Sequence, residues 1–150
     1  MSKINVGLFV DTVSGNDFLQ SVYEELSNSE HVLDISVFYK EASDDNPKYL
    51  KCGLFPSVNI MDFKGVLICD SIENAYASKE AINSINIYSS LKGYTFIKYY
   101  FMGSHNSCVK YFATTKEQNE LFYRETRNKV DIDCSTDLSK LTKYIIENER

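Results

Sequence analysis

The loop at residues 11–17, with the sequence DTVSGND, carries side chains that could bind a phosphate group. It follows an apolar run and precedes an amphipathic pattern, so the expected order is a strand, a tight polar loop and a helix. Backbone N–H groups at the start of a helix favour anions, and a glycine lets the backbone come close to them. The candidate phosphate-binding residues are Thr12, Ser14, Gly15 and Asn16.

The same loop has a second interpretation, in which it only starts the helix. Asp17 and Gln20 have the spacing of a capping box, and Gly15 supplies a backbone conformation that other residues avoid. A carboxylate at position 17 would also compete with a phosphate for the helix N-terminus. A dinucleotide site needs three glycines where this loop has one, although Glu41 could serve as its ribose partner. The sequence alone does not decide between these two interpretations, a phosphate-binding loop and a helix cap.

The stretch TVSGND also resembles the Thr/Ser-x-Thr-Gly-x-Thr loop that holds the phosphate of flavin mononucleotide (FMN) in flavodoxins. The resemblance implies a flavodoxin-like electron carrier whose phosphate contacts come from the four loop residues named above. One position departs from that pattern, because Asp17 stands where the family has a hydroxyl. Aromatic residues that would sandwich the flavin ring have no clear counterpart, so this hypothesis ranks last.

Four further residues are candidates because they follow predicted strands. Asp11, Asp70, Ser71 and His105 are expected at the carboxyl edge of a parallel sheet, which is where such sheets bind their ligands. A phosphoryl-accepting receiver domain would need a second acid after the first strand and a lysine after a late one. Threonines occupy both places. No residue is assigned a catalytic role from sequence.

Two other groupings could in principle carry chemistry. Asp131 and Asp133 form a D-x-D motif, which holds a divalent metal when both carboxylates share one face of a strand. The motif precedes a helix, so we interpret it as a solvated strand end and predict no metal site. His105 and Cys108 could form a nucleophilic pair, but no acid that would orient the histidine is evident. The four cysteines are far apart and are predicted to be free thiols.

Size and charge limit the function classes. The chain has 150 residues, which predicts one domain over residues 1–150. Its formal net charge is −5 and it has no cluster of lysines and arginines, which argues against nucleic-acid binding through bulk charge. It has no signal segment and no apolar run of the ~18 residues that a membrane span requires. We therefore expect a cytoplasmic protein without a membrane partner.

Strand and helix patterns alternate along the chain. Strands are predicted at residues 3–10, 34–40, 65–69, 94–101, 108–113 and 129–133. Helices are predicted at residues 17–28, from 71 to about 87, after a capping box at 114–118, and around 138–145, while 41–64 is predicted to be a packed connection with one short helical turn. This alternation predicts an α/β fold, a three-layer Rossmann-like domain with about six mostly parallel strands.

A more specific resemblance extends over nearly the whole chain. The segments that carry it, in order, are VGLFVDTVSGNDFLQSVYEEL, DISVFY, CGLFPSVNIMDFKGVLI, SIENAYASKEAINSINIY and VKYFATTKEQNELFYRETRNKVDIDCSTDLSKLTKYI. Together they resemble the small glycosyltransferase-like proteins of T4-like phages, many of them marine. The stretch FMGSHNS departs from that pattern, because such proteins often have an aromatic and acidic segment there.

The resemblance implies one Rossmann-like half of a two-domain glycosyltransferase, acting in the host cytoplasm. Such a protein would bind a nucleotide sugar and, if active, transfer its sugar. The alternative is a non-catalytic Rossmann-like module that binds another protein. A half-enzyme could also restore a two-sided cleft as a homodimer, for which the aromatic strand at residues 94–101 is the candidate contact. No cofactor is assigned with certainty.

Overall fold

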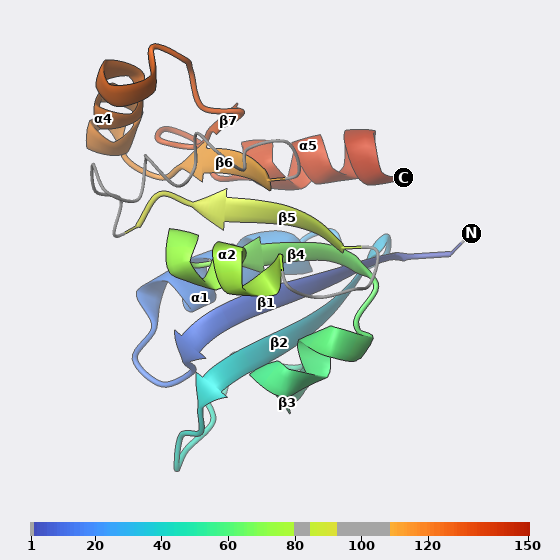
Figure 1. Cartoon of the computed structure of the whole chain (residues 1–150). Helices are drawn as coiled ribbons and strands as arrows, with labels where there is room; N and C mark the ends of the chain where they lie inside the picture. Colours follow the sequence, from blue (N-terminus) through green and yellow to red (C-terminus); the bar gives the residue numbers. More distant parts are fainter. Residues whose placement is uncertain (1, 80–84, 93–108) are drawn as a thin grey trace.

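The computed structural model describes residues 2–79, 85–92 and 109–150 and contains one parallel sheet (Figure 1). In the described residues its strands are β1 (Ile4–Thr12), β2 (Leu33–Glu41), β3 (Gly53–Pro56), β4 (Gly65–Cys69), β5 (Ile85–Ser90), β6 (Val109–Ala113) and β7 (Ile132–Asp133). Their order across the sheet is β3-β2-β1-β4-β5-β6-β7, and every pairing is parallel. The first six strands follow the order 3-2-1-4-5-6 that defines a Rossmann-like sheet. The predicted fold class is confirmed.

Helices cover both faces of this sheet. Helices α1 (Asp17–Ser27) and α5 (Ser139–Glu149) pack on one face. The 3₁₀ helix η1 (Ser57–Asp62), α2 (Ile72–Ser78) and α4 (Lys116–Thr126) pack on the other. Figure 1 shows α2 in front of the sheet and α1 and α5 behind it. Within the described residues, no helix combines the length and the hydropathy that crossing a bilayer requires.

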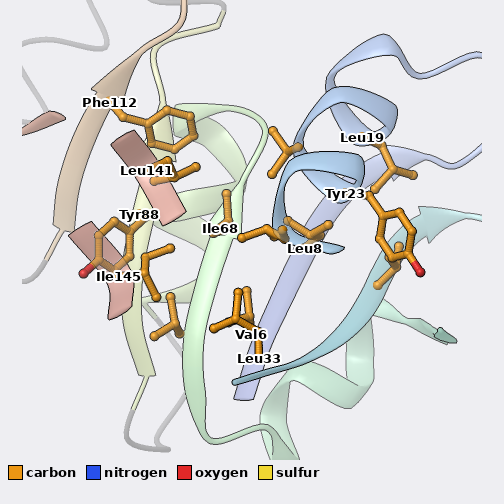
Figure 2. Packing of buried hydrophobic residues seen from close by; sticks show 14 of the residues in the cluster. Val6, Leu8, Leu19, Tyr23, Leu33, Ile68, Tyr88, Phe112, Leu141 and Ile145 are labelled. Carbon is orange, nitrogen blue, oxygen red and sulfur yellow. The ribbon is translucent and has the colours of Figure 1, made fainter. Parts of the chain in front are cut away.

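The core on the α1 side explains why these segments assemble. Leu8 and Ile68 from the central strands are fully buried against Leu19 of α1 and Ile145 of α5 (Figure 2). Burying one such side chain contributes about 1.5–3 kcal/mol. Helix α1 places its buried residues at the spacing i, i+3, i+4 and i+7 that the sequence predicts, namely Leu19, Val22, Tyr23 and Leu26.

Two predicted elements differ from the observed ones. The helix predicted to run to residue 87 ends at Ser78, and Ile85 begins strand β5. Isoleucines in a short apolar run fit a helix or a strand equally well, so periodicity alone misassigns them. The connection at 41–64 contains its expected helical turn as η1, but also the edge strand β3, whose Pro56 is tolerated because an edge strand need not use every N–H. The strand predicted at 94–101 lies outside the described residues.

Candidate functional site

The strand order reverses between β1 and β4, because β2 and β3 lie on one side of β1 and the later strands lie on the other. In an open α/β sheet, ligands bind beyond the carboxyl ends of the strands at such a point. The arrowheads of β1, β2 and β5 in Figure 1 mark this one edge. Asp11 and Thr12 end β1 there, and Asp70 and Ser71 follow β4. The predicted residues of these two strand ends are therefore neighbours, while His105 lies outside the described residues.

The loop after β1 is held by hydrogen bonds within the chain. The Ser14 hydroxyl donates to the backbone oxygen of Asp45 over 2.7 Å, and the Ser14 N–H donates to the hydroxyl oxygen of Ser43 over 3.3 Å. The Asn16 amide nitrogen donates to the backbone oxygen of Thr12 over 2.9 Å. These contacts fasten the loop to residues 43–45 and leave the groups of Ser14 and Asn16 engaged without a phosphate.

The helix cap is Asn16, and the predicted capping box of Asp17 and Gln20 is wrong by one residue. The Asn16 carboxamide oxygen accepts from the backbone N–H of Leu19 over 2.9 Å. Asp17 is instead the first helical residue, where its charge complements the positive end of the helix. Gly15 has φ +65°, the left-handed conformation that the sequence predicts for this turn.

The loop after β4 is built differently, around a buried asparagine on α2. The Asn74 amide nitrogen donates to Asp70 Oδ1 over 2.7 Å and to Asp11 Oδ1 over 3.1 Å. Asn74 is 0% exposed and Asp70 is 3% exposed. Lys40 Nζ lies 3.5 Å from Asp11 Oδ1. We call Asp11, Asp70, Asn74 and Lys40 the acid–amide network.

The electrostatics of this network follow from burial. Burial raises the pKa of the Asp70 carboxyl, the hydrogen bond from Asn74 opposes that rise, and the nearby charge of Asp11 adds to it. The carboxamide oxygen Asn74 Oδ1 is buried and has no hydrogen-bond partner among the described residues. An unsatisfied buried acceptor is uncommon in folded proteins and calls for an explanation.

Asn74 was not among the residues predicted from sequence. Ser71 caps α2 by accepting from the Asn74 N–H over 3.3 Å, so the helix start itself is ordinary. The available signal was that Asn74 falls on the apolar side of the helix, between Ile72 and Ala75, which are both buried. A carboxamide in that position must have a polar partner inside the protein, and Asp70, four residues earlier at the end of β4, is one acid that the sequence places nearby.

A pocket of about 470 Å³ opens at the same edge on the other face of the sheet. Segments far apart in sequence build it, since it joins the first turns of α1 to the ends of β5, β6 and β7. We call it the α1-side pocket. Its lining residues are Asp17, Phe18, Ser21, Val22, Ser90, Lys92, Thr114, Gln118, Cys134 and Leu138.

The wall of the α1-side pocket is rigid in several places. The Phe18 ring stacks on the buried ring of Phe112, with centroids 6.3 Å apart. Gln118 Oε1 accepts from the Thr114 N–H over 2.8 Å and lies 3.2 Å from the Thr114 hydroxyl. Burial raises the pKa of the Cys134 thiol to about 11, so this side chain is a neutral thiol and not a nucleophile at neutral pH.

No protein-family model, curated protein or solved structure matches this chain. Rossmann-like sheets support many unrelated chemistries, so the strand order alone does not name a reaction. The arguments about function therefore rest on the α1-side pocket and the acid–amide network, two of the polar constructions that the described residues form at the ligand-binding edge of the sheet.

The D-x-D motif does not present two carboxylates to one metal in this structure. Asp131 Oδ2 accepts from the backbone N–H of Tyr111 over 2.8 Å, whereas Asp133 Oδ1 accepts from the Ser135 hydroxyl over 2.6 Å and from Asn119 over 2.7 Å. Each carboxylate thus serves a separate structural purpose. In the part of the chain that the structure describes, no group of three or more histidine, cysteine or acidic residues could hold a metal ion.

Proposed function

We propose that this protein binds a nucleotide sugar in the α1-side pocket, as a glycosyltransferase-like protein acting in the cytoplasm of an infected host cell. The observation that carries the proposal is the pocket itself, a hollow of about 470 Å³ at the carboxyl edge of a Rossmann-like sheet. Ligand sites of this size and position are common in α/β proteins. The resemblance to phage glycosyltransferase-like proteins suggests the same class of ligand.

The lining of the pocket suits a sugar attached to a phosphate. Ser21, Ser90 and Thr114 supply hydroxyl groups that can donate to or accept from sugar hydroxyls. The Asp17 carboxylate can accept hydrogen bonds from two sugar hydroxyls, and Lys92 provides a positive charge for a phosphate group. We therefore assign the phosphate contact to Lys92, because the side chains of Ser14 and Asn16 in the loop after β1 bond within the chain.

The test is a thermal-shift and calorimetric screen with nucleoside diphosphate sugars, nucleoside diphosphates and FMN. A ligand that binds only the folded protein raises its melting temperature by mass action. Ser21 is an exposed helical residue on the pocket wall, so Ser21→Trp should block the pocket without unfolding the protein. Gln20→Trp is the matched control, because Gln20 is exposed on the same helix but does not line the pocket.

We expect nucleotide sugars to stabilise the wild-type protein and the Gln20→Trp variant, and to have no effect on Ser21→Trp. Lys92→Gln should weaken binding of the nucleotide, while Lys64→Gln, before strand β4 at the opposite edge, should not. The proposal fails if no nucleotide sugar binds, or if both tryptophan variants bind equally well. A yellow protein stabilised by FMN would favour the electron carrier instead. Turnover of a bound nucleotide sugar by the isolated chain would extend the proposal from binding to catalysis.

A separate observation favours the protein-binding module as a second candidate. Phe55, Val58 and Met61 are 38%, 70% and 47% exposed at the β3 edge of the sheet. Residues three apart lie on one side of a 3₁₀ helix, so Val58 and Met61 form an apolar ridge on η1. A second copy of the chain is the simplest partner, because most homo-oligomers are symmetric dimers. Val58→Asp should then abolish a dimer seen by light scattering, and a monomeric wild-type protein at high concentration would contradict this candidate.

A further inference from the structure

We infer that the acid–amide network binds a hydrated divalent cation of the Mg²⁺ class, with Asp11, Asp70 and Asn74 as its ligands. This site lies at the ends of β1 and β4, where the strand order reverses. None of these three residues lines the nucleotide-sugar pocket, although Lys92, which does line it, also acts on Asp70 through its charge. It requires two carboxylate oxygens, one carboxamide oxygen and water, which is a donor set that hard cations accept.

The geometry of the two carboxylates supports the proposal. A single atom, Asn74 Nδ2, lies 2.7 Å from Asp70 Oδ1 and 3.1 Å from Asp11 Oδ1. The carboxylate oxygens of two different strands therefore converge on one point. In this structure the N–H groups of Asn74 occupy that point and offset the negative charge, as a small cation would.

The second observation is the carboxamide oxygen of Asn74. The side chain is 0% exposed, and within residues 2–79, 85–92 and 109–150 its Oδ1 atom has no hydrogen-bond partner. The carboxamide is aimed at both acids through its nitrogen, and rotation about its terminal torsion is broad and nearly two-fold. A half-turn would present Oδ1 to a cation held between Asp11 and Asp70, in exchange for the two hydrogen bonds that Nδ2 now donates to those carboxylates.

The exposed Asp11 side chain gives a cation access to the site, and the charge of Lys40 competes with the cation for this carboxylate. The Asp11 side chain is 60% exposed, so a cation can reach the pair from solvent and keep water ligands on that side. Mg²⁺ sites commonly combine one or two carboxylates with several waters. Lys40, 3.5 Å from Asp11, supplies part of the missing positive charge in the cation-free protein. It would move away when a cation binds.

The experiment is an NMR titration with Mg²⁺, in which the side-chain amide signals of Asn74 are followed. We expect those signals to shift with a dissociation constant on the order of 10⁻⁴ to 10⁻³ M, the range of weak sites with few charged ligands. Mn²⁺ should broaden signals around Asn74 first. Asp11→Asn should weaken binding by about tenfold or more, while its oxygen can still accept from Asn74 and keep the fold.

Two further variants make the outcome specific. Lys40→Gln removes the competing charge and should strengthen Mg²⁺ binding, whereas Asp34→Asn, at the opposite end of β2, should leave it unchanged. The proposal is overturned if the Asn74 amide signals do not respond up to about 10⁻² M Mg²⁺, above the range expected for such sites. It is also overturned if Asp11→Asn and Asp34→Asn weaken binding equally, because the response would then reflect general surface charge.

Discussion

The loops after β1 and β4 both start a helix at the point where the strand order reverses, yet they use their asparagines differently. Asn16 has a partner for each end of its carboxamide, since its nitrogen bonds Thr12 and its oxygen caps α1 at Leu19. The Asn74 carboxamide uses only its nitrogen, which donates to Asp11 and Asp70, and its buried oxygen has no partner in the part of the chain that the structure describes.

This difference separates a structural loop from a candidate ligand site. The bonds around Asn16 account for its position without any ligand, because each one fastens the loop or begins the helix. The bonds around Asn74 leave a buried acceptor unsatisfied beside two acids, which a protein tolerates where another group completes the set. A polar side chain near a strand end is therefore weak evidence of a site until its partners are known.

The largest expected effect is that of Asn74→Ala. It removes the donor shared by two carboxylates, one of them buried, and hydrogen bonds to charged groups contribute about 1.5–3 kcal/mol. We expect the free energy of unfolding to fall by about 2–3 kcal/mol, measured by urea denaturation. A smaller loss of unfolding free energy than that caused by Asn16→Ala would contradict the comparison between the two loops.

The next effect distinguishes the helix cap from its neighbour. Asn16→Ala should lower the free energy of unfolding by about 1 kcal/mol, the usual cost of removing a cap. Asp17→Ser should cost less, about 0.3–1 kcal/mol, because only a charge near the helix end is lost. Urea denaturation of both variants checks this order. A larger loss of unfolding free energy for Asp17→Ser than for Asn16→Ala would support the capping box predicted from sequence.

These two loops also show how much of the candidate site can be predicted from the sequence. Asp11, Asp70 and Ser71 were predicted at the ligand edge, because an apolar strand followed by polar residues is a local pattern. The cap was predicted one residue late, since Asn16 and Asp17 are both favourable cap residues and only the backbone conformation decides between them.

The remaining features depend on tertiary structure, which no local pattern records. Asn74 meets Asp11 across 63 positions of sequence, and the α1-side pocket joins Phe18 to Lys92 and Thr114. The alternation of strands and helices predicted the sheet, because buried parallel strands are apolar runs that local composition reveals. The same rule missed β3, which begins at Gly53, ends at Pro56 and is mostly exposed at the sheet edge.

The end of β7 is a third strand end whose polar side chains bond within the chain, and the pH dependence of stability tests this assignment. Hydrogen bonds from Ser135 and Asn119 lower the pKa of the Asp133 carboxyl to about 2. The unfolded chain has an ordinary carboxyl with a pKa of about 3.9, so this stabilisation is present above pH ~4 and is lost as the pH falls toward 2. Asp133→Asn should therefore lose less stability than the wild type over that interval, measured by denaturation at each pH, and an unchanged slope would contradict the assignment.

The smallest expected effect is that of Ser14→Ala in the loop after β1. Its hydrogen bonds to Ser43 and Asp45 are exposed, so the free energy of unfolding should change by about 0.5 kcal/mol or less. Binding of a nucleotide sugar should not change, because Ser14 does not line the α1-side pocket. Calorimetric titration checks this. A marked fall in the affinity of this variant for the nucleotide sugar would support phosphate binding by the loop after β1.

The most direct test of the account is an amide chemical-shift map of the wild-type protein during titration with a nucleoside diphosphate sugar. The largest shifts are predicted for the residues that line the α1-side pocket, above all Phe18, Ser21 and Thr114. The amide signals of Ser14 and Ser43 should stay close to their starting chemical shifts. Shifts centred on Ser14 and Ser43, or no shifts at all, would contradict the placement of the ligand on the α1 side of the sheet.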